Sequence, residues 1–330
     1  MKLDKIEFNK DKLNICQVSL KGNIPIIIEN YQKLKFFYGD LNIFIICPKK
    51  DFKFFKKKLK YDEFTIIGED QIVSFSKFQK IFYRLSKKYK FKSLFKKRLS
   101  WYYQQVLKLA FAFYFLKKKN KRIILWDADT IITKKIKFFS GDFSSKFGTF
   151  TEFHKSYFEI NKVLLGQLPK YFISSVVQFG PITSFESKRL MRKLKIKSNK
   201  INDIANNLST LIMREIFLMD VSYNGSLFSE YELIGNFKIQ IKPEKQNIIA
   251  SLRKGLKGTL SSKQLYFLNL LNITNVTYEH THKNSNSMGM LKRKVSWYDF
   301  IIVVFKTKLK FYYNVIKHNV LFIFNIDKMN

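Results

Sequence analysis

The chain has 330 residues, of which 46% are hydrophobic and 17% aromatic, and its 61 Lys and Arg outnumber its 25 Asp and Glu to give a formal net charge of +36. This composition excludes an intrinsically disordered chain, which would combine high net charge with few aromatic residues. Only eight of the basic residues are Arg, the residue that nucleic-acid-binding proteins favour for base and phosphate contacts. The excess of Lys therefore fits codon drift in an AT-rich genome better than nucleic-acid binding.

The two cysteines, Cys16 and Cys47, lie in apolar segments without metal-binding spacing. We expect them to be buried, reduced thiols, which suits a cytoplasmic protein. The N-terminal residues show no signal peptide, and no uncharged apolar run approaches the about 20 residues of a membrane span. The sequence therefore predicts a cytoplasmic protein, either free or peripheral to the inner membrane.

The first 70 residues alternate apolar, β-branched segments with amphipathic ones. Strands are predicted over Leu13–Leu20, Leu41–Cys47 and Phe64–Gly68, and helices over Ile24–Phe37 and Phe52–Leu59. Strands that are apolar along their whole length are typical of a parallel sheet covered on both faces. We therefore predict an α/β fold with a mostly parallel sheet flanked by helices.

The next segments are longer. Residues 73–99 are basic and helical, Ser100–Leu116 is predicted as an apolar helix capped by Ser100, and Arg122–Trp126 is predicted as a strand. Past residue 150 short strands and helices mix, with a helix near 201–218. No linker rich in Gly, Ser or Pro interrupts the chain, so one continuous domain is expected before a basic and aromatic segment over 291–330.

Two aspartates, Asp127 and Asp129, come directly after the strand that ends at Trp126. Ligands of open α/β sheets bind outside the carboxyl ends of strands. Paired carboxylates there suit a hard divalent cation, Mg²⁺ or Mn²⁺, that bridges to a diphosphate. The alternative is a solvated turn in which an Asp caps the next segment.

A second chemistry also uses two aspartates after a buried strand. Haloacid-dehalogenase-type phosphohydrolases use the first as nucleophile and the second as acid and base. The motif of that family has Thr or Val where this chain has Ile131. In that family the motif also lies on the first strand, whereas here the aspartates begin at residue 127. A phosphohydrolase is therefore the second interpretation.

The helix that opens at Trp101 carries polar residues on one side. Trp101, Gln104, Gln105 and Lys108 fall within an arc of roughly 100°. Amides both donate and accept hydrogen bonds, which suits contact with hydroxyls, a base or a sugar. The alternative is a narrow solvated stripe.

Three motifs occur in order: Trp101-Tyr102-x-Gln104-Gln105-x-x-Lys108-Leu109, Leu125-x-Asp127-x-Asp129-Thr130, and Ser229-Glu230-Tyr231-Glu232-x-x-Gly235-Asn236. With them the chain resembles an uncharacterised bacterial family regarded as metal-dependent, nucleotide-sugar glycosyltransferases of the GT-A type. The resemblance spans 101–236 and implies a GT-A-like domain over 1–290. Its nucleotide-binding half would cover about 1–135 and its acceptor half about 136–290, followed by the basic segment 291–330.

The resemblance implies the roles of the site residues. Asp127 and Asp129 would hold Mn²⁺ or Mg²⁺ against the diphosphate of a UDP-type donor. The side chains on the donor side would be Gln104, Gln105, Lys108, Trp126 and Asp127. A saccharide or lipid-linked saccharide of bacterial surface glycans, such as lipooligosaccharide or capsule, would be the acceptor.

Two further sets of residues are candidates for the reaction. If Ser229–Glu232 is extended, Glu230 and Glu232 share a face opposite Tyr231. The resemblance implies that one of these glutamates would be the general base, if the enzyme inverts. The alternative is a salt-bridged surface turn. His280 or His282 is a candidate third metal ligand, weighed against an inert exposed histidine.

The segment 291–330 carries eight basic and two acidic residues among many aromatic ones. Segments of this composition lie on anionic bilayers, which would suit a lipid-linked acceptor. The alternative is a pair of helices packed on the domain. Nucleic-acid binding is the competing, non-enzymatic class, against which stand the few Arg and the absence of a nucleic-acid-binding motif.

Overall fold

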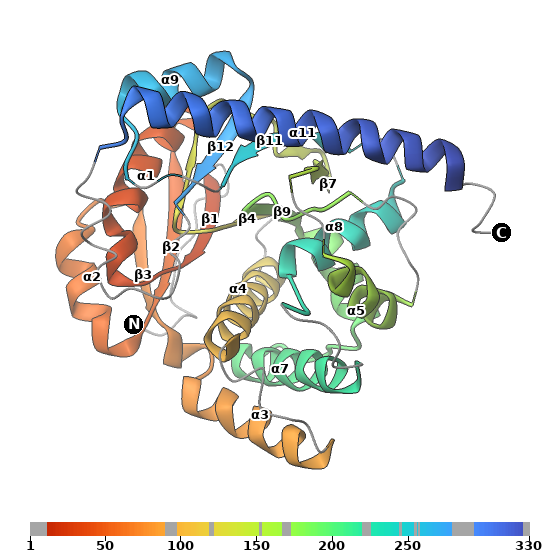
Figure 1. The fold of residues 1–330 in the computed structure, drawn as a ribbon. Helices are drawn as coiled ribbons and strands as arrows, with labels where there is room; N and C mark the ends of the chain where they lie inside the picture. The colour runs from red at the N-terminus through yellow and green to blue at the C-terminus, as the bar shows by residue number, and fades with distance from the viewer. Residues whose placement is uncertain are drawn as a thin grey trace.

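The computed structural model describes residues 12–89, 98–118, 122–151, 154–166, 173–219, 226–243, 246–253, 256, 258–278 and 294–325. Within them lies a central five-stranded sheet in the order β3-β2-β1-β4-β9 (Figure 1). Its strands are β1 Leu13–Val18, β2 Leu41–Cys47, β3 Phe64–Gly68, β4 Arg122–Trp126 and β9 Phe179–Thr183. The first four strands are parallel, and β9 runs antiparallel to β4. The predicted α/β class with a mostly parallel sheet is confirmed.

Helices cover both faces of this sheet because successive side chains of each strand point to opposite faces. Ile43 and Ile45 of β2 pack with α1 (Ile24–Tyr38) and α2 (Phe52–Lys58) on one face. Phe44 and Ile46 pack on the other face, in a core built by α3 (Phe75–Lys88), α4 (Leu99–Lys117) and α7 (Ile201–Leu218). Cys16 and Cys47 are buried free thiols, as predicted.

The second half of the chain adds short elements around the sheet. A three-stranded sheet in the order β11-β12-β5 packs beside α1. The short strands are β5 Thr130–Ile132, β6 Phe139–Ser140, β7 Phe143–Ser144, β8 Phe147–Gly148, β10 Asn247–Ile248, β11 Ala250–Leu252 and β12 Ile273–Thr277. The further helices are α5 Lys155–Leu165, α6 Ser184–Lys193, α8 Glu230–Ile241 and α9 Ser262–Leu270.

The C-terminal segment forms one long helix, α11 (Trp297–Asn325), and not the pair of helices considered above. It runs across the molecule past α9 and β11 (Figure 1). Within the described residues, no helix combines the length and apolar character needed to cross a membrane.

Two local predictions are wrong. Ser100 does not cap α4, because the helix begins at Leu99 and Arg98 stands at the N-cap position. The segment Ser229–Glu232 is not extended beyond Ser229, because α8 begins at Glu230. Acidic residues in a first helical turn are stabilised by the helix dipole, which favours this helix start.

Candidate active site

The Asp127–Asp129 turn lies at the carboxyl end of β4. The amide of Thr130 donates to the carbonyl oxygen of Asp127 at 3.1 Å, which closes the turn. Trp126 is fully buried, stacks on Phe179 and donates through its indole nitrogen to the carbonyl oxygen of Thr130 at 2.9 Å. The Trp126 side chain therefore anchors the turn from the interior of the protein. Because this side chain is fully buried, it does not face a ligand, contrary to the donor contact predicted for it.

The position of this turn in the sheet is the one where ligands bind in open α/β folds. The chain moves outward from β1 to β2 and β3, and then returns to place β4 on the other side of β1. The strand order therefore reverses between β1 and β4. Ligands of open α/β folds bind outside the carboxyl ends of the strands at such a point, and Asp127 and Asp129 lie at this position of the sheet.

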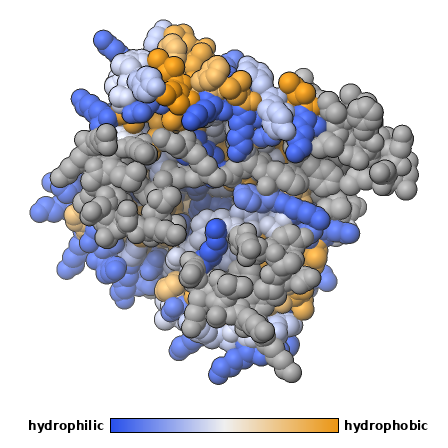
Figure 2. Space-filling view, in the orientation of Figure 1, coloured by the Kyte–Doolittle hydropathy of each residue, from blue (hydrophilic) through white to orange (hydrophobic). Residues whose placement is uncertain are grey.

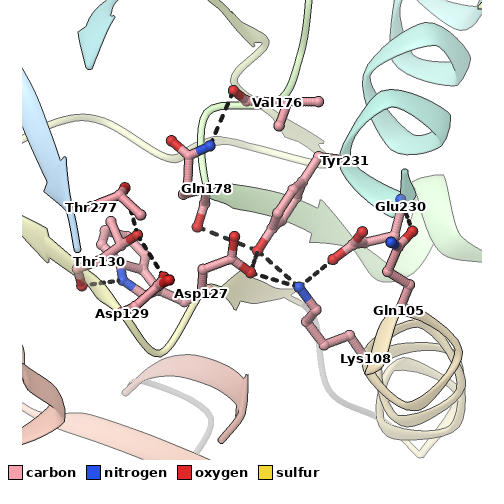
Figure 3. Close-up of polar contacts among 11 residues, drawn as sticks. Gln105, Lys108, Asp127, Asp129, Thr130, Val176, Gln178, Glu230, Tyr231 and Thr277 are labelled. Atoms are coloured by element: carbon pink, nitrogen blue, oxygen red, sulfur yellow. Dashed lines mark hydrogen bonds and ion pairs between the residues drawn. The ribbon is translucent and has the colours of Figure 1, made fainter. Parts of the chain in front are cut away.

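Asp127 is held by two donors from different helices (Figure 3). Lys108 Nζ on α4 and the Tyr231 hydroxyl on α8 each donate to Asp127 Oδ1 at 2.7 Å. Its backbone amide donates to the carbonyl oxygen of Gln178 at 2.9 Å. Within the described part of the chain no donor contacts Asp127 Oδ2, and the side chain is 30% exposed. Asp127 is thus fixed through one oxygen and presents the other.

Lys108 is the centre of a buried charge cluster. Its ammonium also pairs with the carboxylate of Glu230, and the side chains of Lys108 and Glu230 are 7% and 2% exposed. Burial lowers the pKa of Lys108, but the carboxylates of Asp127 and Glu230 outweigh this effect and raise it above its usual value. Burial raises the pKa of Glu230, against the opposing effect of Lys108. Two acidic side chains, Asp127 and Glu230, therefore share one ammonium.

Tyr231 completes the cluster and was not predicted as a site residue. Lys108 Nζ lies 3.2 Å from its hydroxyl oxygen, and the hydroxyl lies 3.3 Å from the carbonyl oxygen of Gln178. Burial, with the nearby carboxylates of Asp127 and Glu230, raises the pKa of Tyr231 well above its usual value. The hydroxyl therefore stays protonated and donates to Asp127.

Gln178 is a second residue that sequence reasoning missed. It precedes β9 and adopts φ of 64°, a left-handed conformation that is uncommon for a residue other than glycine. In that conformation its carbonyl oxygen accepts from the Asp127 amide and lies 3.3 Å from the Tyr231 hydroxyl. Strained backbone of this kind clusters at functional sites. Its partner Asp127 lies 51 positions away in the chain, so no local pattern could have indicated the contact.

Asp129 occupies the other side of the turn and is partly exposed. Its carbonyl oxygen accepts from the amide of Tyr278 at 2.8 Å, and Thr130 Oγ1 lies 3.5 Å from Asp129 Oδ1. Thr130 in turn lies 2.8 Å from the hydroxyl of Thr277 on β12. The β5–β12 pairing therefore holds Asp129 in the turn that follows β4, two residues from Asp127.

The two glutamates predicted as catalytic residues are both buried. The carboxylate of Glu230 pairs with Lys108, and the backbone amide of Glu230 donates to Gln105 Oε1 at 3.2 Å. Glu232 is fully buried and accepts from Ser174 Oγ at 3.0 Å and the Ser175 amide at 2.9 Å. Neither carboxylate faces solvent, which favours positioning roles over the predicted general base.

The remaining predicted residues lie around the cluster. Gln105 is buried with its Nε2 lacking a partner among the described residues, whereas Gln104 is half-buried. His280 and His282 lie outside the described residues. Across the described ranges, no group of three or more His, Cys, Asp or Glu comes together as a metal site. Two carboxylates with waters and substrate phosphates are, however, the usual protein environment of Mg²⁺ at phosphate sites.

The chain belongs to a family of unknown function, DUF6492, whose model matches residues 30–312. A search of curated proteins gives no match. Among solved structures, mouse xyloside xylosyltransferase 1 in its apo form is similar over 84% of this chain and 99% of that one, with 11% sequence identity and a TM-score of 0.40. At that identity and score the likeness assigns no activity to this chain.

Proposed function

We propose that this protein is a metal-dependent glycosyltransferase of the GT-A type. It would transfer a sugar from a nucleotide-sugar donor, of the UDP type, to a saccharide or lipid-linked saccharide acceptor. The observation that carries the proposal is the Asp127–Asp129 turn at the point where strand order reverses, with Asp127 held by Lys108 so that one carboxylate oxygen stays open.

The donor set suits a divalent cation. Asp127 and Asp129 offer hard oxygen ligands, and both side chains are partly exposed. Mn²⁺ or Mg²⁺ bound there would stabilise the charge that develops on a departing nucleoside diphosphate. The role of the protein is then to hold the two carboxylates in a fixed geometry.

Lys108 and its partners carry out that positioning. The ammonium fixes Asp127 Oδ1, Glu230 fixes the ammonium, and Gln105 accepts from the Glu230 amide. Tyr231 adds a second donor to the same carboxylate oxygen. This network links α4, α8 and β4, so a change at any of these residues is expected to displace Asp127.

A donor-hydrolysis assay tests the proposal. The protein is incubated with UDP-, GDP- and CDP-sugars in the presence of Mn²⁺ or EDTA, and release of the nucleoside diphosphate is measured. Release with one donor class is expected, and it should be lost with EDTA. In Asp127→Asn/Asp129→Asn the rate should fall by at least about 100-fold, as when an electrostatic contact to the transition state is removed.

A matched control separates this effect from the change in charge. Asp40→Asn/Asp62→Asn removes two exposed carboxylates elsewhere and is expected to retain the activity. Full activity in Asp127→Asn/Asp129→Asn would overturn the proposal. Hydrolysis of simple phosphomonoesters, with a phosphoryl group trapped on Asp127, would replace it with the phosphohydrolase.

A further inference from the structure

The outward face of α11 is an apolar stripe in an otherwise lysine-rich surface. Seven of its described apolar residues are each more than half exposed, Tyr313 among them. The other six follow one another at intervals of three or four residues, and we call them the outer stripe: Tyr298, Ile301, Phe305, Leu309, Tyr312 and Ile316. Their spacing of three or four residues places them within an arc of about 80° and over a length of about 27 Å. A continuous exposed apolar surface of this kind marks an interaction site.

The opposite face of α11 already anchors the helix to the protein. Phe300 and Val304 are buried in a core shared with α9 and β12. Further along, Asn314 Nδ2 donates to the carbonyl oxygen of Phe150 at 2.7 Å, and Phe311 packs on the Phe150 ring. The outer stripe is therefore not needed to attach the helix, and its side chains are presented on a fixed support.

The apolar surface continues onto α9. Tyr266 and Leu270 are each 64% exposed, and Phe267 packs on the ring of Trp297 at the start of α11. In Figure 2 hydrophobic residues gather over α9 and the adjoining part of α11, next to hydrophilic ones. The surface thus spans two helices rather than a single ridge.

Lysines border the stripe on both sides. Helical spacing places Lys306, Lys310 and Lys317 along one edge and Lys308 along the other. Between Trp297 and Lys317 the described helix carries one acidic side chain, Asp299 in the first turn. An apolar stripe with basic edges is the pattern of helices that lie in the interface of an anionic bilayer.

We propose that α11 and α9 dock this protein on an anionic lipid bilayer. The outer stripe would enter the boundary between headgroups and acyl chains, and the bordering lysines would contact lipid phosphates. A second copy of the chain is disfavoured as the occupant, because both faces would bring the same lysines together on chains of net charge +36. The proposal does not depend on the glycosyltransferase assignment.

Vesicle flotation of the full chain tests this docking. Binding is expected to vesicles that mix phosphatidylcholine with phosphatidylglycerol, and to be much weaker for pure phosphatidylcholine. Ile301→Ser/Phe305→Ser/Leu309→Ser should reduce binding to the anionic vesicles by at least about tenfold, because three apolar side chains no longer leave water. Unchanged binding of this variant would overturn the proposal.

A matched control variant tests whether any loss of exposed apolar side chains reduces vesicle binding. Phe36→Ser/Val163→Ser/Leu218→Ser removes three exposed apolar side chains elsewhere and should bind like the unmodified protein. Near-ultraviolet circular dichroism checks that both triple variants remain folded. Equal loss of binding in the two variants would contradict a role specific to the stripe.

Charge variants test the lysine borders in the same way. Lys306→Gln/Lys310→Gln/Lys317→Gln should bind anionic vesicles more weakly than Lys53→Gln/Lys57→Gln/Lys60→Gln, which loses the same charge from another exposed segment. Equal weakening would indicate attraction by net charge alone and would overturn the proposal. The proposal would also be overturned if no vesicle binding is seen and light scattering shows a dimer that Ile301→Ser/Phe305→Ser/Leu309→Ser abolishes.

Discussion

Lys108 Nζ lies 2.7 Å from Asp127 Oδ1 and joins the middle of α4 to the carboxyl end of β4. The same ammonium pairs with Glu230 at the start of α8. A buried lysine shared by two carboxylates is costly to break, because removal of one partner leaves an uncompensated charge in the interior. The geometry of the proposed metal site therefore depends on this one side chain.

Lys108→Met should destabilise the protein by about 3 kcal/mol, since it leaves the buried Glu230 carboxylate without its counter-charge. Urea unfolding measures the change. Lys108→Met/Glu230→Gln should recover much of the loss, because it removes both buried charges. A double variant as unstable as the sum of the two single variants would contradict the coupling.

Tyr231→Phe removes one donor to Asp127 Oδ1 and keeps the ring. The free energy of unfolding should fall by about 1 kcal/mol, the usual contribution of one hydrogen bond. The affinity for UDP with Mn²⁺, measured by calorimetry, should also fall severalfold, because Asp127 is less firmly oriented. Altered stability with unchanged affinity would show that Tyr231 acts only on the fold.

Gly235 allows α8 to approach the segment before β9. A Cβ at this position would lie 1.9 Å from Ser175 Oγ and 2.3 Å from Ser175 Cβ. Gly235→Ala should therefore destabilise the protein by about 2 kcal/mol through overpacking. Ser175→Gly removes both contacts, so Gly235→Ala should cost much less in that background. An equal cost in the two backgrounds would rule out this contact as the cause.

Lys238 gives a dependence of stability on pH. It is buried on α8, and burial lowers its pKa to about 8, against the opposing effect of Glu186 and with a smaller contribution from Lys146. Between about pH 8 and 10.5 the unfolded chain then binds a proton that the folded chain does not, so this lysine makes the unfolding free energy rise with pH. Below that window both states are protonated, and this dependence vanishes.

The measurement compares urea unfolding at pH 7.5 and 9.5 for the unmodified protein and Lys238→Met. The difference in unfolding free energy between them should shift by about 1–2 kcal/mol in favour of the unmodified protein at the higher pH. Comparison of the two proteins cancels the other titrating groups. Lys188→Met, at an exposed position of α6, provides the control and should show no such shift.

The sequence allowed the four parallel strands of the central sheet to be predicted, because buried parallel strands are continuous apolar runs, but it did not indicate the antiparallel strand β9. Leu41–Cys47 was predicted with the bounds that β2 has, and the order of strands and helices up to β3 also agrees. The short strands β6, β7, β8 and β10 have two residues each, too few to show a periodicity.

The candidate site was predictable only in part. Asp127 and Asp129 stood out because acidic residues are scarce in this chain. The burial of Lys108 between Asp127 and Glu230, by contrast, follows from the packing of α4 against β4 and α8, which no local pattern reveals. In an extended segment Tyr231 would point away from the glutamates, whereas α8 begins at Glu230 and the Tyr231 hydroxyl reaches Asp127 Oδ1.

The central claim is that Asp127 and Asp129 bind a divalent cation together with a nucleoside diphosphate. Electron paramagnetic resonance of Mn²⁺ tests it directly, since the signal of the free ion falls when the ion is bound. With UDP present, the unmodified protein should lower this signal below the level set by UDP alone, and Asp127→Asn/Asp129→Asn should not. Equal lowering by the two proteins, or none by the unmodified protein with UDP, GDP and CDP alike, would contradict the account.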